Sequence, residues 1–213
     1  MPGTSHFLPP YQRRGVLFVL SGPSGVGKDA LLAEVGRRET NGYNGVDRAI
    51  TATTRAPRPN EIPGEDYLFW TEAGFREHIM ADQMLEWAEV YGNLYGTPRA
   101  GVDSALSAGR SVVLKIDVQG AASVRRAVPG AVLLFLAPPS LQELEARLRN
   151  RLTDSSEAID RRLSTALHEM QALPDYDYVV VNDDLATAAD EVRAIFLAEQ
   201  RRVKNLREMM NAE

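Results

Sequence analysis

The chain has 213 residues, of which 44% are hydrophobic and 25% are charged. These values are typical of a folded globular domain and exclude a disordered chain, a fibrous repeat and a minimal disulfide scaffold. The net charge of −5 disfavours general nucleic-acid binding but leaves room for a local basic pocket. The sequence contains no cysteine, and its apolar runs are too short to cross a bilayer. We therefore expect a soluble cytoplasmic protein without a nucleic-acid or membrane partner.

Apolar runs of strand length alternate with segments of helical spacing along most of the chain. Such alternation predicts an α/β fold in which a parallel sheet is flanked by helices. The predicted strands are 16–21, 112–117, 132–137 and 178–182, and the predicted helices are 28–38, 101–107, 118–128, 141–151 and 157–173. One long amphipathic helix is predicted for the C-terminal residues 184–210.

Two stretches interrupt this alternation. Residues 50–97 carry strand-like segments on either side of a short helix, which predicts a small mixed-sheet insertion. Residues 150–156 are short, polar and flanked by arginines, as in a mobile lid. The first 14 residues lack apolar periodicity and are expected to be a disordered tail. The predicted domain is 15–213, with a core of 15–49, 98–149 and 157–213, the insertion 50–97 and the lid 150–156.

Residues 22–28, GPSGVGK, directly follow one predicted strand and directly precede a predicted helix. This is the G-x-x-x-x-G-K pattern of a phosphate-binding loop (P-loop) in its required context. The glycines let consecutive backbone N–H groups point into one concavity at a helix N-terminus, and Lys28 reaches the β- and γ-phosphates. The segment predicts a nucleoside triphosphate site formed by Gly22, Pro23, Ser24, Gly25, Val26, Gly27, Lys28 and Asp29.

The insertion carries side chains suited to the phosphate of a second substrate. Arg55 and Arg58 lie three residues apart in a proline-rich segment that cannot be helical. Two guanidinium groups presented from one loop suit a phosphate dianion. Tyr67 and Tyr95 carry hydroxyls that can complete the same cradle.

A guanine base is the acceptor that the remaining polar residues of the insertion favour. Glu86 lies on a predicted strand whose neighbouring side chains face the other way. Its carboxylate can accept from N1–H and N2–H₂ of guanine, a pair of donors that adenine lacks. The hydroxyls of Thr51 and Thr97 can contact the remaining purine atoms.

These motifs, in this order, resemble those of the guanylate kinases, which phosphorylate GMP with ATP and Mg²⁺. The resemblance rests on GPSGVGK, TTRAPRPNEIPGEDYLF, EWAEVYGNLYGTP, IDVQGA, FLAPPS and VNDD, and it covers about residues 15–204. It implies a P-loop core, a GMP-binding subdomain and a lid. The implied GMP site is Thr51, Arg55, Arg58, Glu61, Tyr67, Glu86, Tyr95, Gly96, Thr97 and Asp117. The implied catalytic set is Lys28, Arg58, Arg147, Arg151 and Arg162, with Asn182 and Asp183 near the adenine of ATP.

Asn60, Asn150 and Leu152 stand where the family usually has glycine. Two further departures concern the P-loop and the strand beside it. Asp29 stands where the P-loop usually has the hydroxyl that binds Mg²⁺, and Lys115 stands where the family often has an acidic residue. Because the strand that carries Lys115 lies beside the P-loop in such folds, we expect the two side chains to meet. On this interpretation Asp29 is the candidate metal ligand and Lys115 offsets its charge. One alternative is that both substitutions are neutral and that ATP and water hold the ion. Another is an enzyme impaired by the two substitutions, against which the otherwise complete site argues.

The sequence thus predicts an enzyme that transfers the γ-phosphoryl group of ATP to GMP or dGMP. Two other functions stay open at this point. One is a sugar-phosphate kinase of the ribose-bisphosphate type, because the GKD ending of the P-loop resembles that family. The other is a non-catalytic guanylate-kinase-like binding domain, although the preserved P-loop argues against it.

Overall fold

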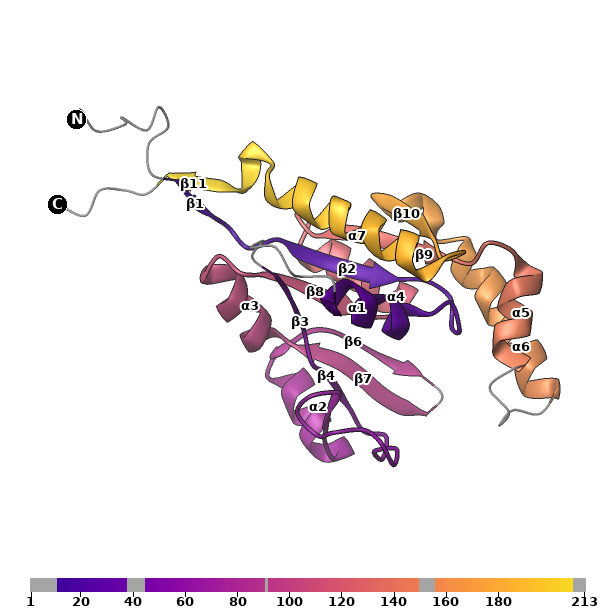
Figure 1. Cartoon of the computed structure of the whole chain (residues 1–213). Coiled ribbons are helices and arrows are strands. Elements are labelled where there is room, and N and C mark those ends of the chain that lie inside the picture. Colours follow the sequence, from indigo (N-terminus) through magenta and orange to yellow (C-terminus); the bar gives the residue numbers. More distant parts are fainter. Residues whose placement is uncertain (1–10, 38–44, 91, 150–155, 209–213) are drawn as a thin grey trace, which may run out of the picture.

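A five-stranded parallel sheet forms the centre of the computed structural model, which describes residues 11–37, 45–90, 92–149 and 156–208 (Figure 1). The strand order is β10-β9-β2-β8-β3, and every pair in it is parallel. The predicted α/β class is therefore confirmed. The strands are β2 (Leu17–Ser21), β3 (Val46–Arg48), β8 (Ser111–Lys115), β9 (Val132–Ala137) and β10 (Tyr178–Val181).

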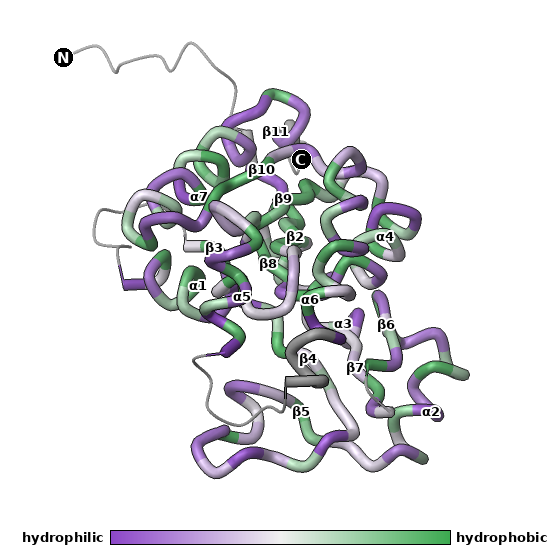
Figure 2. The backbone as a smooth tube through the Cα atoms, turned by 90° about the vertical axis from the view of Figure 1, so that its right-hand side faces the viewer, coloured by the Kyte–Doolittle hydropathy of each residue, from purple (hydrophilic) through white to green (hydrophobic). Residues whose placement is uncertain are grey.

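Helices cover both faces of this sheet because alternate side chains of β2 point in opposite directions. Phe18 and Leu20 pack with α1 (Lys28–Arg37) and α7 (Leu185–Gln200). Leu17 and Val19 pack with α3 (Arg99–Ser107) and α4 (Val118–Ala127). Strands buried on both faces read as continuous apolar runs, and Figure 2 shows β2 and β9 as mainly hydrophobic. None of the helices in the described ranges has the length and apolar content needed to cross a membrane.

The insertion forms a second, mixed sheet beside the first. Its strand order is β5-β4-β7-β6, with one parallel pair and two antiparallel pairs. Phe75 of α2 (Glu72–Met80) packs on one side of this sheet, against Ala52, Met84 and Leu94. This arrangement agrees with the mixed sheet expected for residues 50–97. The strands are β4 (Thr51–Thr53), β5 (Tyr67–Phe69), β6 (Met84–Val90) and β7 (Asn93–Pro98).

Two helices form a projection on the side of the phosphate loop. Helix α5 (Leu141–Arg149) and helix α6 (Ser156–Met170) pack through Leu144, Leu148 and Ala166. Figure 1 shows the pair at one end of the molecule. The predicted lid lies outside the described residues except for Ser156, which is the first residue of α6.

The two ends of the described chain pair with each other. Strand β1 (Tyr11–Arg13) is antiparallel to β11 (Leu206–Glu208), so these three residues of the expected tail form a strand. The expected helix over residues 184–210 is wrong in its extent, because α7 ends at Gln200. The side-chain amide of Asn205 donates to the carbonyl of Glu199 at 2.7 Å, and a short 3₁₀ helix, η2 (Val203–Asn205), turns the chain towards β1. A further 3₁₀ helix, η1 (Leu173–Asp175), precedes β10.

Phe18 is the clearest test of this core. Its ring is fully buried and lies 4.4 Å, centroid to centroid, from the ring of Phe196. Phe18→Ala removes this packing and leaves a cavity, so we expect it to lower the free energy of unfolding by about 3 to 5 kcal/mol. Urea titration measures the effect. Val203→Ala is the control, because that side chain is 81% exposed, and an equal loss in both variants would contradict the assigned core.

Candidate active site

The phosphate loop joins β2 to α1 at the carboxyl edge of the parallel sheet, where α/β proteins bind ligands. Gly22, Gly25 and Gly27 all have positive φ, at 139°, 87° and 102°. A Cβ on Gly22 would lie 2.2 Å from the carbonyl oxygen of Leu136, and one on Gly27 would lie 2.6 Å from Nδ2 of Asn182. Both the conformation and the available space therefore require glycine here.

Neighbouring elements brace the loop from two sides. The Asn182 side chain, at the end of β10, is buried and donates from Nδ2 to the carbonyl of Val26 at 2.7 Å. Leu148 of α5 lies against Gly25, with its Cδ2 within 2.6 Å of the position of a Cβ there. Asn182, predicted to lie near adenine, thus also holds the shape of the loop.

Lys28 is the last residue of the G-x-x-x-x-G-K motif and is partly buried. Its Nζ donates to the carbonyls of Gly22 at 2.5 Å and Pro23 at 3.0 Å. Burial lowers the pKa of Lys28 to about 8, and the nearby carboxylate of Glu169 acts in the opposite direction. An ammonium group at the end of a glycine-rich loop and at the N-terminus of a helix is suited to binding an anion.

Glu169 was not among the predicted site residues. It lies near the end of α6 and its Oε2 accepts from the backbone N–H of Ser24 at 3.2 Å. Burial raises the pKa of Glu169, whereas Lys28 lowers it. Its position within a predicted helix carried no sign of this contact, because the contact spans 145 residues.

In the insertion, Arg55 lies in contact with three other predicted GMP-site residues, namely Glu61, Tyr67 and Tyr95. Arg55 forms two hydrogen bonds with Glu61, at 2.8 and 3.0 Å, and donates from Nε to the Tyr95 hydroxyl at 3.2 Å. Its guanidinium carbon lies 5.4 Å from the centroid of the Tyr67 ring. The backbone N–H of Arg58 donates to Glu61 at 2.8 Å, while the Arg58 side chain is exposed. Glu61 therefore orders the loop that presents both arginines.

A pair of carboxylates meets where β6 approaches the N-terminus of α4. Glu86 is 5% exposed and accepts from the Thr97 hydroxyl at 2.7 Å. Asp117 is the N-cap of α4 and accepts from the N–H of Gly120 at 2.8 Å. A Cβ on Gly120 would lie 2.9 Å from Oε2 of Glu86 and 3.3 Å from Oδ1 of Asp117. Gly120 thus leaves space between the two carboxylates. It was not among the predicted site residues, and the one sequence feature that pointed to it was a glycine in the first turn of a predicted helix.

Burial gives the Glu86 carboxylate an unusual affinity for a proton. It raises the pKa of Glu86 to about 7; the Thr97 hydroxyl lowers it and the negative charge of Asp117 raises it further. A buried acceptor of this kind is suited to a ligand that presents N–H donors, because such donors replace the lost solvation.

The contact expected between Asp29 and Lys115 is confirmed. The Lys115 ammonium group donates to Oδ1 of Asp29. Partial burial acts to raise the pKa of Asp29, but Lys115, Arg48 and Lys28 together lower it. Asp29 is thus a carboxylate held in its charged form at the end of the P-loop.

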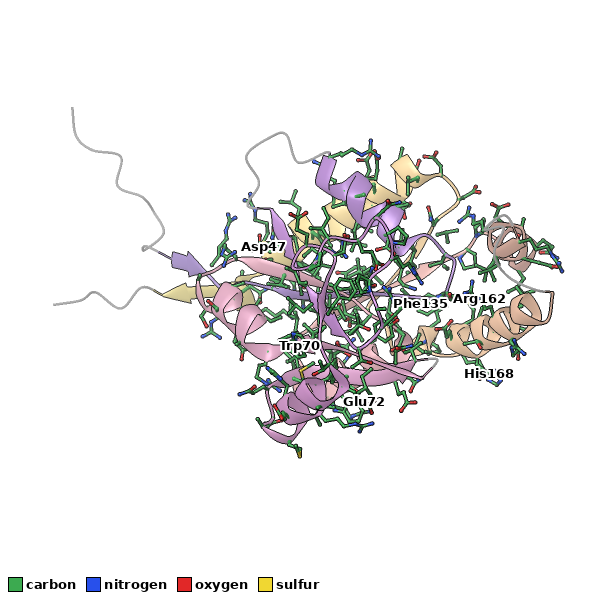
Figure 3. All side chains as sticks on the ribbon, turned by 90° about the horizontal axis from the view of Figure 1, so that it is seen from below. Asp47, Trp70, Glu72, Phe135, Arg162 and His168 are labelled. Atoms are coloured by element: carbon green, nitrogen blue, oxygen red, sulfur yellow. The ribbon has the colours of Figure 1, made fainter. Side chains whose placement is uncertain are left out.

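The other predicted site residues lie around this centre. Thr51 and Gly96 are buried in the mixed sheet, and Asp183 is exposed after β10. Arg147 of α5 donates to Glu143 at 2.8 Å. Arg162 lies on α6 (Figure 3). Arg151 lies outside the described residues.

A single carboxylate at the P-loop fits one way in which Mg²⁺ binds in nucleotide sites. In the described ranges, no three His, Cys, Asp or Glu side chains come together as a metal site. Mg²⁺ is commonly held by one or two carboxylates with phosphate oxygens and water. Asp29 is the residue at the P-loop that could supply one such ligand, and its carboxylate also accepts from Lys115.

The fold and the site together define a P-loop kinase, in which a glycine-rich phosphate loop ends one strand of the parallel sheet and a second sheet carries its own buried polar groups. A sequence model of one family, described as guanylate kinase, matches residues 14–199. The chain belongs to the guanylate kinase family.

Individual relatives agree with this assignment. The chain is 46% identical over 193 residues to a protein of Desulfitobacterium hafniense named guanylate kinase, covering 91% of this chain and 94% of the relative. It is 49% identical over 183 residues to a guanylate kinase of Gloeobacter violaceus, covering 86% and 87% of the two chains. The crystal structure of a guanylate kinase from Anaplasma phagocytophilum superposes with a TM-score of 0.75 at 32% identity and covers 94% of each chain.

The raised pKa of Glu86 predicts a stability effect with a definite sign. Because the folded-state pKa lies above the usual value of 4.5, ionisation of this group opposes folding at high pH. The opposition disappears as pH falls through about 7 towards 4.5. Glu86→Gln should therefore raise the free energy of unfolding at pH 8 by an amount on the order of 2 to 3 kcal/mol and leave it nearly unchanged near pH 4.5.

Urea titrations of the nucleotide-free protein at both pH values measure this difference. Glu89→Gln is the matched control, because Glu89 lies on the same strand with its side chain exposed. An equal change in the free energy of unfolding of the two variants at pH 8 would show that burial does not destabilise the ionised form of Glu86.

Proposed function

We propose that this protein transfers the γ-phosphoryl group of ATP to GMP or dGMP, giving ADP and GDP or dGDP. The observation that carries the proposal is the buried Glu86 carboxylate, which lies across Gly120 from Asp117. Two carboxylate groups this close together match N1–H and N2–H₂ of guanine. Adenine would place a lone pair against the Glu86 carboxylate.

The phosphate of GMP binds to the guanidinium and phenol groups of the insertion. Arg55, Tyr67 and Tyr95 already lie together, and Arg58 lies on the adjoining loop. Arginine binds phosphate through two parallel N–H donors, which fixes the orientation of the anion as well as its position.

ATP binds with its phosphates in the P-loop, from Gly22 to Asp29. Its adenine lies near Asn182 and Asp183, which follow β10. Arg147 on α5 and Arg162 on α6, together with Arg151, which lies outside the described residues, neutralise the charge that develops on the transferred group.

The reaction needs no strong general base. The attacking oxygen of GMP is already anionic, and the transition state of phosphoryl transfer is loose. Positioning by Arg58 and charge neutralisation by Lys28 are therefore the main contributions of the chain. Mg²⁺, held by Asp29 with phosphate oxygens and water, would supply further positive charge when bound.

A coupled assay of ADP formation tests the proposal against its alternatives. The purified protein is given ATP with GMP, dGMP, AMP or ribose 1,5-bisphosphate. Turnover of GMP and dGMP but not of AMP is expected. Turnover of the sugar phosphate alone would identify a sugar-phosphate kinase, and binding of GMP without turnover of any acceptor would identify a non-catalytic domain.

Glu86→Gln tests the assignment of the base-binding residue. The amide has one acceptor oxygen and places its NH₂ group against the guanine donors. We expect kcat/KM for GMP to fall by about 10- to 100-fold, as for loss of charge-assisted hydrogen bonds. Glu89→Gln should retain the wild-type value, and unchanged GMP efficiency in Glu86→Gln would contradict the assignment.

A further inference from the structure

Lys115 occupies a position between the two halves of the site. It is the last residue of β8, and its Cα is paired with that of Leu20, which lies two residues before the P-loop. Its side chain is only 11% exposed. The side chain therefore leaves the sheet at the same edge as the phosphate loop.

The Lys115 ammonium group contacts both halves. On the side of the P-loop it donates to the carboxylate of Asp29. On the side of the insertion it lies 3.5 Å from the Tyr67 hydroxyl and 5.4 Å from the centroid of the Tyr67 ring. Arg58 lines the same cavity of about 450 Å³ as Asp29, Tyr67 and Lys115.

A purely structural role explains this arrangement poorly. The Asp29 side chain is 75% exposed, and an ion pair with one solvated partner contributes little to stability. Removing most of the solvent from a lysine costs free energy that such a pair does not return. A phosphate beside Tyr67 and Arg58 would return it, because it would give the ammonium group a second anionic partner.

Lysine is also rare in this chain. Only three lysines occur in its 213 residues, and two of them, Lys28 and Lys115, lie at this site. They are close enough that the charge of Lys115 opposes protonation of Lys28. Two ammonium groups held near each other are suited to a site that takes more than one phosphate.

We propose that Lys115 binds the phosphate of the acceptor nucleotide and that Asp29 positions its ammonium group for that contact. Lys28 then serves the donor phosphates and Lys115 the acceptor phosphate. This inference rests on the proposed function and adds a cation to the acceptor site beyond the arginines and tyrosines of the insertion.

Calorimetric titration of the full chain with GMP and with guanosine, without ATP or Mg²⁺, tests the first part. Lys115→Met should weaken GMP binding about tenfold, the size expected for one charge-assisted hydrogen bond, and leave guanosine binding unchanged. Lys115→Arg keeps the charge and should lie between wild type and Lys115→Met. Lys204→Met, which replaces the exposed third lysine, should bind GMP as the wild type does.

Wild-type affinity for GMP in Lys115→Met would overturn the inference, as would an equal loss for GMP and guanosine. Circular dichroism melts identify a variant that fails to fold, in which case Lys115→Arg and Lys115→Gln carry the comparison. Turnover of GMP by the wild type is measured in parallel. Its absence would refute the proposed function, whereas its presence with unaltered binding in Lys115→Met would refute only this inference.

A double-mutant cycle tests the positioning role of Asp29. Asp29→Asn removes a negative charge near the phosphates in any background, but it releases the ammonium group only where Lys115 is present. We therefore expect the substitution to change GMP affinity by different factors in the wild type and in Lys115→Met. Equal factors would show that Asp29 does not position Lys115.

Discussion

The position of β2 in the middle of the parallel sheet brings the P-loop close to the polar residues that end the neighbouring strands. Its neighbours β8 and β9 run in the same direction, so the three strands end at one edge. The P-loop follows β2, while Lys115 and Asp117 stand at and just beyond the end of β8. Asn182 follows β10, one strand further out. A different order of parallel strands would keep these residues at the carboxyl edge but would place them further apart along it.

The burial of charged groups is compensated differently at the P-loop and in the second sheet. Lys28 donates to two loop carbonyls and lies near the carboxylate of Glu169. These contacts stabilise the positive charge of Lys28 against the effect of burial. Glu86 has one hydroxyl donor and lies near another negative charge, so its ionised form is left under-solvated. At the P-loop, contacts within the protein thus compensate most of the cost of burying Lys28. The Glu86 carboxylate lacks such compensation within the protein, which is common for ionisable groups at functional sites.

The sequence was sufficient to predict the elements whose signals are local. Continuous apolar runs predicted four strands of the parallel sheet, and GPSGVGK between a strand and a helix predicted the P-loop. The pairing of Asp29 with Lys115 was also predicted, because strand adjacency in P-loop folds is regular. Contacts between distant segments were not accessible in this way. The bond of Glu169 to Ser24 depends on how α6 packs, and the end of α7 at Gln200 depends on pairing between the first and last strands. Neither the contact of Glu169 nor the end of α7 produces a periodic pattern of apolar residues in the sequence.

The bond from Asn182 to the carbonyl of Val26 links two properties that would otherwise vary separately. The same amide stands beside the proposed adenine pocket and fixes the curvature of the loop that holds the phosphates. A residue chosen to favour another base in the donor would have to reproduce this hydrogen bond in the same volume, next to a glycine that leaves no space for a larger group. Drift in donor preference during evolution is therefore restricted at this position. Asp183 belongs to the same proposed adenine pocket and is exposed. In the described part of the chain it has no hydrogen bond to the P-loop like that of Asn182, so a substitution there that alters the base preference for the phosphoryl donor meets less constraint.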